Sequence, residues 1–204
     1  MLFPINLPDK PIILASGSPR RAEILKKIGL RFAVQPSAID ECQPWDHRSP
    51  AEYTQELAKR KARAVAAPIN NGIVIGADTI VVLGAELLGK PASEAEAREM
   101  LRRLAGKTHR VFTGFAIIDR PSNHEVAASE MTEVTFRDLD DAEIAAYVRS
   151  GEPMDKAGAY GIQDASAVFA ERINGCFYNV VGFPLTRFYL TLHSFFRNHG
   201  KGGL

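Results

Sequence analysis

One acidic side chain, Asp78, lies inside the apolar stretch IVIGADTIVVL, residues 73–83. An ionised carboxylate in such surroundings loses much of its hydration unless a cation, a metal or hydrogen-bond donors compensate it. Gly76, two residues earlier, would let another chain segment or a ligand approach closely. We therefore interpret Asp78 as a catalytic or metal-binding carboxylate, with a structural ion pair as the alternative.

Two lysines stand where each can reach an anion. A helical wheel for residues 49–67 places Lys61 on the apolar face, where it either delivers a charge into a pocket or extends along its own methylenes to solvent. Lys90 ends the stretch GAELLGK, whose spacing imitates a phosphate-binding loop. Because Pro91 stands where that loop needs a Mg²⁺-binding Ser or Thr, we exclude a P-loop and retain Lys90 as a lysine in a turn.

The stretch ASGSPRR, residues 15–21, places two arginines at the start of a predicted helix. The amino end of a helix carries partial positive charge and unpaired N–H groups, so cations there are unfavourable unless an anion lies nearby. A turn at Gly17 can direct N–H groups at a phosphate, and Ser16 and Arg20 add further donors. The alternative is a helix cap followed by two exposed arginines, and Arg21 is as suited to bracing the site as to touching a ligand.

Together these side chains favour phosphate chemistry with a divalent metal. Glu41 and Asp78 are carboxylates able to hold Mg²⁺ or Mn²⁺, which prefer oxygen ligands and substrate phosphates. The histidines show no paired metal-ligand spacing, and no G-x-S-x-G motif indicates a serine hydrolase. The cations that would face the phosphates are Arg20, Lys61 and Lys90.

Composition excludes several other classes of protein. The chain has 204 residues, of which 46% are hydrophobic, and it carries 25 Lys and Arg against 24 Asp and Glu. This balance does not favour binding to a polynucleotide, which requires a basic surplus. No apolar run approaches the roughly 20 residues that span a bilayer, and the prolines near the start argue against a signal peptide. We therefore expect a cytoplasmic protein with no membrane partner.

The hydrophobic pattern predicts an α/β fold with a mixed sheet and flanking helices. Ser49 with Glu52, and Ser93 with Glu96, have the spacing of capping boxes. We expect residues 197–204, which are rich in glycine, to form a loose tail. The predicted strands cover residues 11–15, 31–34, 73–83, 111–119, 125–136 and 167–173, and the predicted helices cover 19–28, 49–67, 93–105, 140–148 and 184–196.

The chain resembles the Maf family of nucleoside triphosphate pyrophosphatases, in particular its dTTP/UTP branch. The resemblance implies hydrolysis of the α–β phosphoanhydride bond of dTTP or UTP with a divalent cation. It also implies one elongated Maf-like domain over residues 1–204, with two lobes around a cleft as in the inosine triphosphatase-like Ham1 fold, and a homodimer. The motifs that carry the resemblance are LASGSPRRAEIL, GADTIVV, GKP, GEPMDKAGAYGIQ and NVVGFPL.

The resemblance also implies individual roles. Asp78 is similar to the family's proton acceptor, although sequence leaves open whether it takes the proton or mainly binds metal, and Glu41 to a metal-binding or water-orienting carboxylate. The amide of Gln163 offers a donor and an acceptor, which suits the mixed edge of uracil or thymine. The implied phosphate-site residues are Ser16, Arg20, Lys61 and Lys90. The residues implied in base selection are Arg20, Thr79 and Gln163.

Two other functions remain open at this level. One is the hydrolysis of 7-methyl-GTP by the same chemistry, and the other is a nucleotide-binding regulator of cell division without catalysis. One departure from the family pattern bears on substrate ranking. After GIQ the chain reads DASAVFAERI, residues 164–173, and lacks the paired glycines that many relatives carry nearby.

Overall fold

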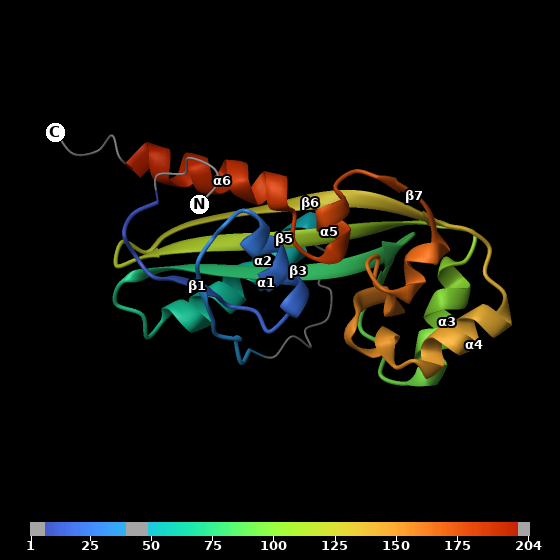
Figure 1. Cartoon of the computed structure of the whole chain (residues 1–204). Helices are drawn as coiled ribbons and strands as arrows, with labels where there is room; N and C mark the ends of the chain where they lie inside the picture. The colour runs from blue at the N-terminus through green and yellow to red at the C-terminus, as the bar shows by residue number, and fades with distance from the viewer. Residues whose placement is uncertain (1–6, 40–48, 200–204) are drawn as a thin grey trace. The chain divides into compact units, whose positions relative to one another are not determined.

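The computed structural model describes residues 7–39 and 49–199 (Figure 1). The predicted site residue Glu41 lies outside these ranges. The strands are β1 (Ile12–Leu14), β2 (Ala33–Val34), β3 (Gly72–Leu83), β4 (Glu86–Leu88), β5 (Thr108–Arg120), β6 (His124–Phe136) and β7 (Ala170–Asn174). The helices are α1 (Pro19–Lys27), α2 (Pro50–Ala66), α3 (Glu94–Leu104), α4 (Asp141–Arg149), α5 (Phe177–Val181) and α6 (Leu185–His199). Short 3₁₀ turns are η1 (Glu152–Asp155), η2 (Ala157–Ala159) and η3 (Ala165–Phe169).

The strands form one mixed sheet of order β2-β1-β3-β5-β6-β7, with β4 paired to β3 off this path. Strand β1 runs parallel to both β2 and β3, with Ile13 opposite Val74 in β3. In contrast, β4 is antiparallel to β3 and β7 is antiparallel to β6. The mixed α/β fold predicted from the sequence is therefore confirmed.

The chain divides into two compact units. The first takes in the described residues up to Asp78, Thr113–Glu130, and those from Gly182 onward, and it holds α1, α2 and α6. The second comprises Thr79–Phe112 and Met131–Val181, and it holds α3, α4, α5 and the 3₁₀ turns. Strands β3, β5 and β6 each contribute residues to both units. The predicted arrangement of two lobes around a cleft stays a prediction.

In the first unit, glycines on two neighbouring strands allow α2 to approach the sheet closely. A Cβ atom on Gly76 of β3 would lie 2.3 Å from the carbonyl oxygen of Ala58. One on Gly114 of β5 would lie 2.4 Å from the backbone of Thr54. Real Cβ atoms do not come so close to backbone, so only glycine fits at either position. The segment that approaches Gly76 is therefore α2, which brings the side chains of this helix directly onto β3.

Aromatic packing holds the remaining layers of each unit. In the first unit, Phe188 of α6 packs on Phe115 of β5 with ring centroids 5.4 Å apart. In the second, α3 and α4 lie side by side (Figure 1) beside a buried aromatic group that includes Phe136 and Phe169. Each unit thus has its own apolar core around its part of the sheet.

Several predicted elements differ from the observed ones. The carboxylate of Glu96 accepts from the backbone N–H of Ala92 at 2.7 Å instead of the Ser93 N–H, so the capping box predicted there is wrong. Strand β7 begins only at Ala170, because the preceding residues form η3, which buries Ser166 and Phe169. Helix α5 was not predicted.

The last helix extends beyond its predicted end. The α6 helix continues to His199, so residues 197–199 are helical instead of loose, and the rest of the predicted tail lies outside the described residues. Among the described helices, none combines the length and apolar character needed to cross a membrane.

Candidate active site

Lys61 and Asp78 form a buried ion pair in the first unit. The Lys61 ammonium donates to Asp78 Oδ1 at 2.7 Å, and the two residues are 4% and 7% exposed. Both were singled out from the sequence, and the structure brings them together. An ion pair with so little solvent contact is held by its surroundings in one geometry, in contrast to a surface pair.

Regular secondary structure positions this pair. Helix α2 begins at a complete capping box, in which Ser49 and Glu52 each accept from the other's backbone N–H. Its buried face includes Leu57, Ala58 and Val65, and Lys61 falls on the same face. The lysine therefore points toward the sheet, as the wheel predicted, and it ends on the carboxylate of Asp78 instead of extending to solvent.

Asp78 keeps capacity for a further ligand. Oδ1 is taken by Lys61, whereas Oδ2 has no side-chain partner within residues 7–39 and 49–199. One available carboxylate oxygen suits a hard divalent cation that draws other ligands from phosphates and water. The described ranges contain no group of three or more His, Cys, Asp or Glu suited to a metal, and Glu41, the other predicted ligand, lies outside them.

The turn before α1 has an internal brace. Arg21 donates from Nε to the carbonyl oxygen of Gly182 at 3.0 Å and from an Nη to Ser16 Oγ at 3.0 Å. It thus holds Ser16, which is 6% exposed, and ties the turn to the start of the C-terminal segment. Arg20 on the first turn of α1 is half-buried, and the cap residue Ser18 makes no side-chain hydrogen bond to the helix. Of the two readings left open for Arg21, the structure supports the brace.

The remaining predicted site residues belong to the second unit. Thr79 follows Asp78 along β3 and is half-buried, while Lys90 and Gln163 are exposed. Lys90 lies between β4 and α3, so no helix starts at its side chain as a P-loop would require. The backbone N–H of Gly158 donates to the carbonyl oxygen of Gly89 at 3.0 Å, which joins the Lys90 turn to the segment that leads to Gln163.

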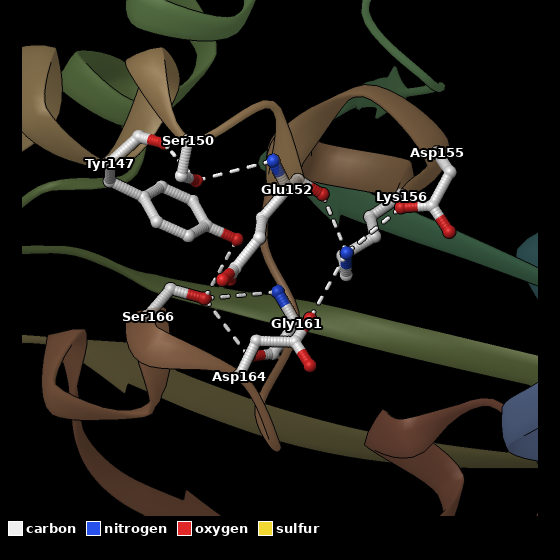
Figure 2. Close-up of polar contacts among 8 residues, drawn as sticks. All are labelled: Tyr147, Ser150, Glu152, Asp155, Lys156, Gly161, Asp164 and Ser166. Atoms are coloured by element: carbon white, nitrogen blue, oxygen red, sulfur yellow. Dashed lines mark hydrogen bonds and ion pairs between the residues drawn. The ribbon is translucent and has the colours of Figure 1, made fainter.

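A second lysine cluster was missed by the sequence analysis. Lys156 is 8% exposed, and its ammonium lies 2.8 Å from Asp155 Oδ1 and 3.0 Å from Asp164 Oδ2 (Figure 2). Burial alone would lower the pKa of Lys156, but hydrogen bonds and charge interactions with the two aspartates outweigh it and raise that pKa. A charged residue amid small residues and glycines was the available signal, although no periodicity accompanied it.

The sheet and its helices have a counterpart among solved structures. A HAM1 protein from Coxiella burnetii matches with a TM-score of 0.54 at 17% identity, over 91% of this chain and 99% of that one. At this level of identity the similarity defines the fold alone, which is a mixed α/β fold of the HAM1 type.

Sequence similarity identifies the family. The family model described as Maf-like protein matches residues 11–195. Relatives named dTTP/UTP pyrophosphatase from Desulforamulus reducens and Pelotomaculum thermopropionicum are each 49% identical over 178 residues, which is 87% of this chain and 93% of theirs. The chain belongs to the Maf family, as the resemblance in its motifs implied.

Proposed function

We propose that this protein hydrolyses dTTP and UTP to the nucleoside monophosphate and pyrophosphate. The observation that carries the proposal is the buried Lys61–Asp78 pair, in which the lysine holds one carboxylate oxygen and the other has no side-chain partner among the residues that the structure describes. The names of the relatives that are 49% identical over most of the chain support the same activity.

The chemistry assigned to Asp78 is activation of water. Water adds to phosphorus at the α–β bridge, the bridging P–O bond breaks, and the water proton passes to the carboxylate. Lys61 holds Oδ1, so that Oδ2 faces the water or a metal in a fixed orientation. The proposal has two versions. In one, Asp78 takes the proton directly, and in the other, it mainly holds the metal.

Binding of the triphosphate is assigned to cationic side chains and to the turn before α1. Arg20 and Lys90 would neutralise phosphate charge, including the charge that develops on departing pyrophosphate. Ser16, held in place by Arg21, would donate to a phosphate oxygen beside the start of α1. Bound Mg²⁺ or Mn²⁺, held by Asp78 and Glu41, would supply further neutralisation of the triphosphate.

Base selection is assigned to Arg20, Thr79 and Gln163. Gln163 is exposed, so its amide is accessible to a nucleobase, and it offers one donor group and one acceptor. A purine such as 7-methylguanine presents a different edge and a larger ring system. We therefore expect pyrimidine nucleotides to be preferred.

A substrate screen with the purified full-length chain tests this function. We expect pyrophosphate release from dTTP and UTP in the presence of Mg²⁺ or Mn²⁺, and loss of that release when EDTA removes the metal. The readout is kcat/KM for each nucleotide, with ATP and 7-methyl-GTP included. A higher kcat/KM for 7-methyl-GTP would contradict the pyrimidine assignment, and no release from any triphosphate would favour a regulator that only binds nucleotides.

The homodimer and the cytoplasmic location expected from the sequence remain parts of this proposal. Light scattering of the purified chain, with and without UTP, tests the oligomeric state. A mass equal to one chain under both conditions would contradict the dimer.

A further inference from the structure

The segment that ends at Gln163 has little regular structure to hold it. Between α4 and β7 the chain forms only the short turns η1, η2 and η3. Short 3₁₀ turns contribute few backbone hydrogen bonds, so their conformation depends on side-chain contacts. The position of Gln163 must therefore be set by residues around it.

Lys156 ties the two ends of this segment together. Its ammonium donates to the carbonyl oxygen of Glu152 at 2.5 Å and to Asp155 Oδ1 at 2.8 Å, and it lies 3.0 Å from Asp164 Oδ2 (Figure 2). An ammonium group has three N–H donors, and here three oxygens surround it. Since one of those oxygens belongs to the residue after Gln163, the lysine restrains the loop in which Gln163 lies.

Ser166 restrains the same loop from its other side. Ser166 is fully buried; its Oγ accepts from the Gly161 N–H at 3.1 Å and donates to the Gly161 carbonyl oxygen at 2.9 Å. The Tyr147 hydroxyl lies 3.1 Å from the same Oγ. In addition, the Asp164 N–H donates to the Gly161 carbonyl oxygen at 3.0 Å and closes a tight turn. Figure 2 shows these contacts converging on Gly161.

The contacts of Lys156, Asp164 and Ser166 with this loop form a clasp, and a side chain at position 161 would have to displace those of Lys156 and Asp164. A Cβ atom there would lie 2.3 Å from Asp164 Oδ2 and 2.7 Å from Lys156 Cε. Next in the chain, Ile162 is buried, whereas Gln163 is exposed. The backbone is thus held on both sides of a single residue whose side chain faces outward.

We propose that Lys156 and Asp164 are positioning residues that fix the backbone of Gln163 so that its amide is preorganised to read the pyrimidine edge. This inference rests on the proposed function, in which Gln163 contacts the base. A preorganised side chain loses less conformational freedom on binding, so the effect falls on nucleotide affinity and selectivity.

The two aspartates around Lys156 provide a matched experiment. Asp164→Asn removes the carboxylate charge next to Gln163. Asp155→Asn removes the other carboxylate charge that contacts Lys156, at a residue that is not adjacent to Gln163. In each variant Lys156 keeps one carboxylate partner. We expect Asp164→Asn to raise KM for UTP and to lower the ratio of kcat/KM for UTP over GTP by roughly tenfold, with kcat nearly unchanged.

Asp155→Asn should leave both KM and this ratio within about twofold, the size expected when an exposed charge is removed. Gln163→Ala is the reference for complete loss of the amide, and thermal melting of every variant reports folding. If Asp164→Asn melts too low to assay, Ser166→Ala removes the opposite restraint and replaces it in the comparison.

The outcomes separate this inference from the proposed function. Equal selectivity in the two asparagine variants, together with altered selectivity in Gln163→Ala, overturns the clasp and leaves the function intact. Unchanged selectivity in Gln163→Ala overturns the clasp as well, because there is then no base contact to position. A wild-type chain that releases no pyrophosphate from UTP overturns the proposed function and the inference with it.

Discussion

Two buried lysines meet aspartates in this protein, and they do so in different ways. Lys61 and Asp78 stand on a helix and a strand, and the carboxylate keeps one oxygen without a side-chain partner among the described residues. Lys156 stands between short turns, and its ammonium is surrounded by two carboxylates and a carbonyl oxygen. Among the described residues, the first pair leaves a carboxylate oxygen that can bind a ligand. The second cluster uses the N–H donors of its lysine to hold the backbone.

The difference shows how a buried charged side chain can be recognised as catalytic or as structural. A catalytic carboxylate must have an oxygen left for water, metal or substrate, and its orientation must be fixed by something else. Asp78 meets both conditions because Lys61 occupies only one of its oxygens. The three N–H donors of Lys156 are directed at Glu152, Asp155 and Asp164 of its own loop, so its effect on catalysis must pass through the loop that it holds.

The largest effect that separates the two clusters is expected on turnover. Asp78→Asn should reduce kcat for UTP hydrolysis by about 10²–10⁴-fold, because the amide can still accept from Lys61 but is a poor base and a poor metal ligand. Asp155→Asn, the corresponding change in the other cluster, should leave kcat near the wild-type value. Steady-state kinetics with both variants checks this, and an Asp78→Asn enzyme with more than a tenth of wild-type kcat would contradict the role of Asp78.

A smaller effect is expected on the free energy of unfolding. Lys61→Met leaves the Asp78 carboxylate without its cation in a nearly buried site, which should lower stability by about 3 kcal/mol. Lys156→Met should lower it by about 1–3 kcal/mol, since its partners Asp155 and Asp164 are 63% and 29% exposed and solvent compensates part of the loss.

Urea denaturation of both methionine variants measures this difference. The control is Lys59→Met on the same helix as Lys61, whose ion pair with Glu56 is 3.9 Å long and partly exposed and should contribute less than about 0.5 kcal/mol. A Lys61→Met protein as stable as this control would show that the buried pair does not hold α2 on β3.

The smallest expected effect is on the pH dependence of the free energy of unfolding, and it arises from a histidine in the second unit. His109 is buried, and its Nε2 lies 2.7 Å from the Tyr160 hydroxyl, which belongs to the segment that Lys156 holds. Burial lowers the pKa of His109 from 6.5 to about 4. The folded state therefore keeps the ring neutral while the unfolded state protonates it. The stability this provides is complete above about pH 6.5 and is lost as pH falls toward 4.

Between pH 8 and pH 5 this residue should account for a loss of about 2 kcal/mol in the free energy of unfolding. His109→Gln should remove that share of the pH dependence, whereas the exposed His124→Gln should retain it. Hydrogen exchange at pH 5 should accelerate first in the second unit, where His109 lies. An equal pH dependence in His109→Gln and wild type would contradict the assignment.

The sequence singled out Lys61 and Asp78 separately, because a regular pattern in each element made the residue stand out, but it did not predict that they pair. The helical period of residues 50–66 placed Lys61 on the buried face, and the apolar run of β3 made Asp78 an anomaly. Both features are local patterns of residue types, and the structure retains the helix and the strand that they predict, because capping and side-chain periodicity act within a few residues. Arg21 could not be resolved in this way, since its acceptor on Gly182 is 161 positions away in the chain.

The structure around the second cluster depends on individual side-chain contacts that leave no periodic pattern in the sequence. Residues 167–169 were predicted as the start of a strand, yet they belong to η3, in which Ser166 turns inward to the backbone of Gly161. Helix α5 begins at Phe177, only three residues after β7 ends at Asn174, and no periodic pattern in so short a segment indicated a helix there. Alternation in short segments is too weak to decide between such outcomes.

By itself, the sequence determined the mixed α/β class, the family and the identity of the anomalous charges, because each of these depends on residue types and local spacing. Only the tertiary structure decided which charges meet. It paired Lys61 with Asp78 through glycines that admit α2 to the sheet, tied Arg21 to the carbonyl oxygen of Gly182, and joined Lys156 to Asp164 across a loop. The physical reason is that ion pairs between distant residues form only after packing has fixed the backbones that carry them.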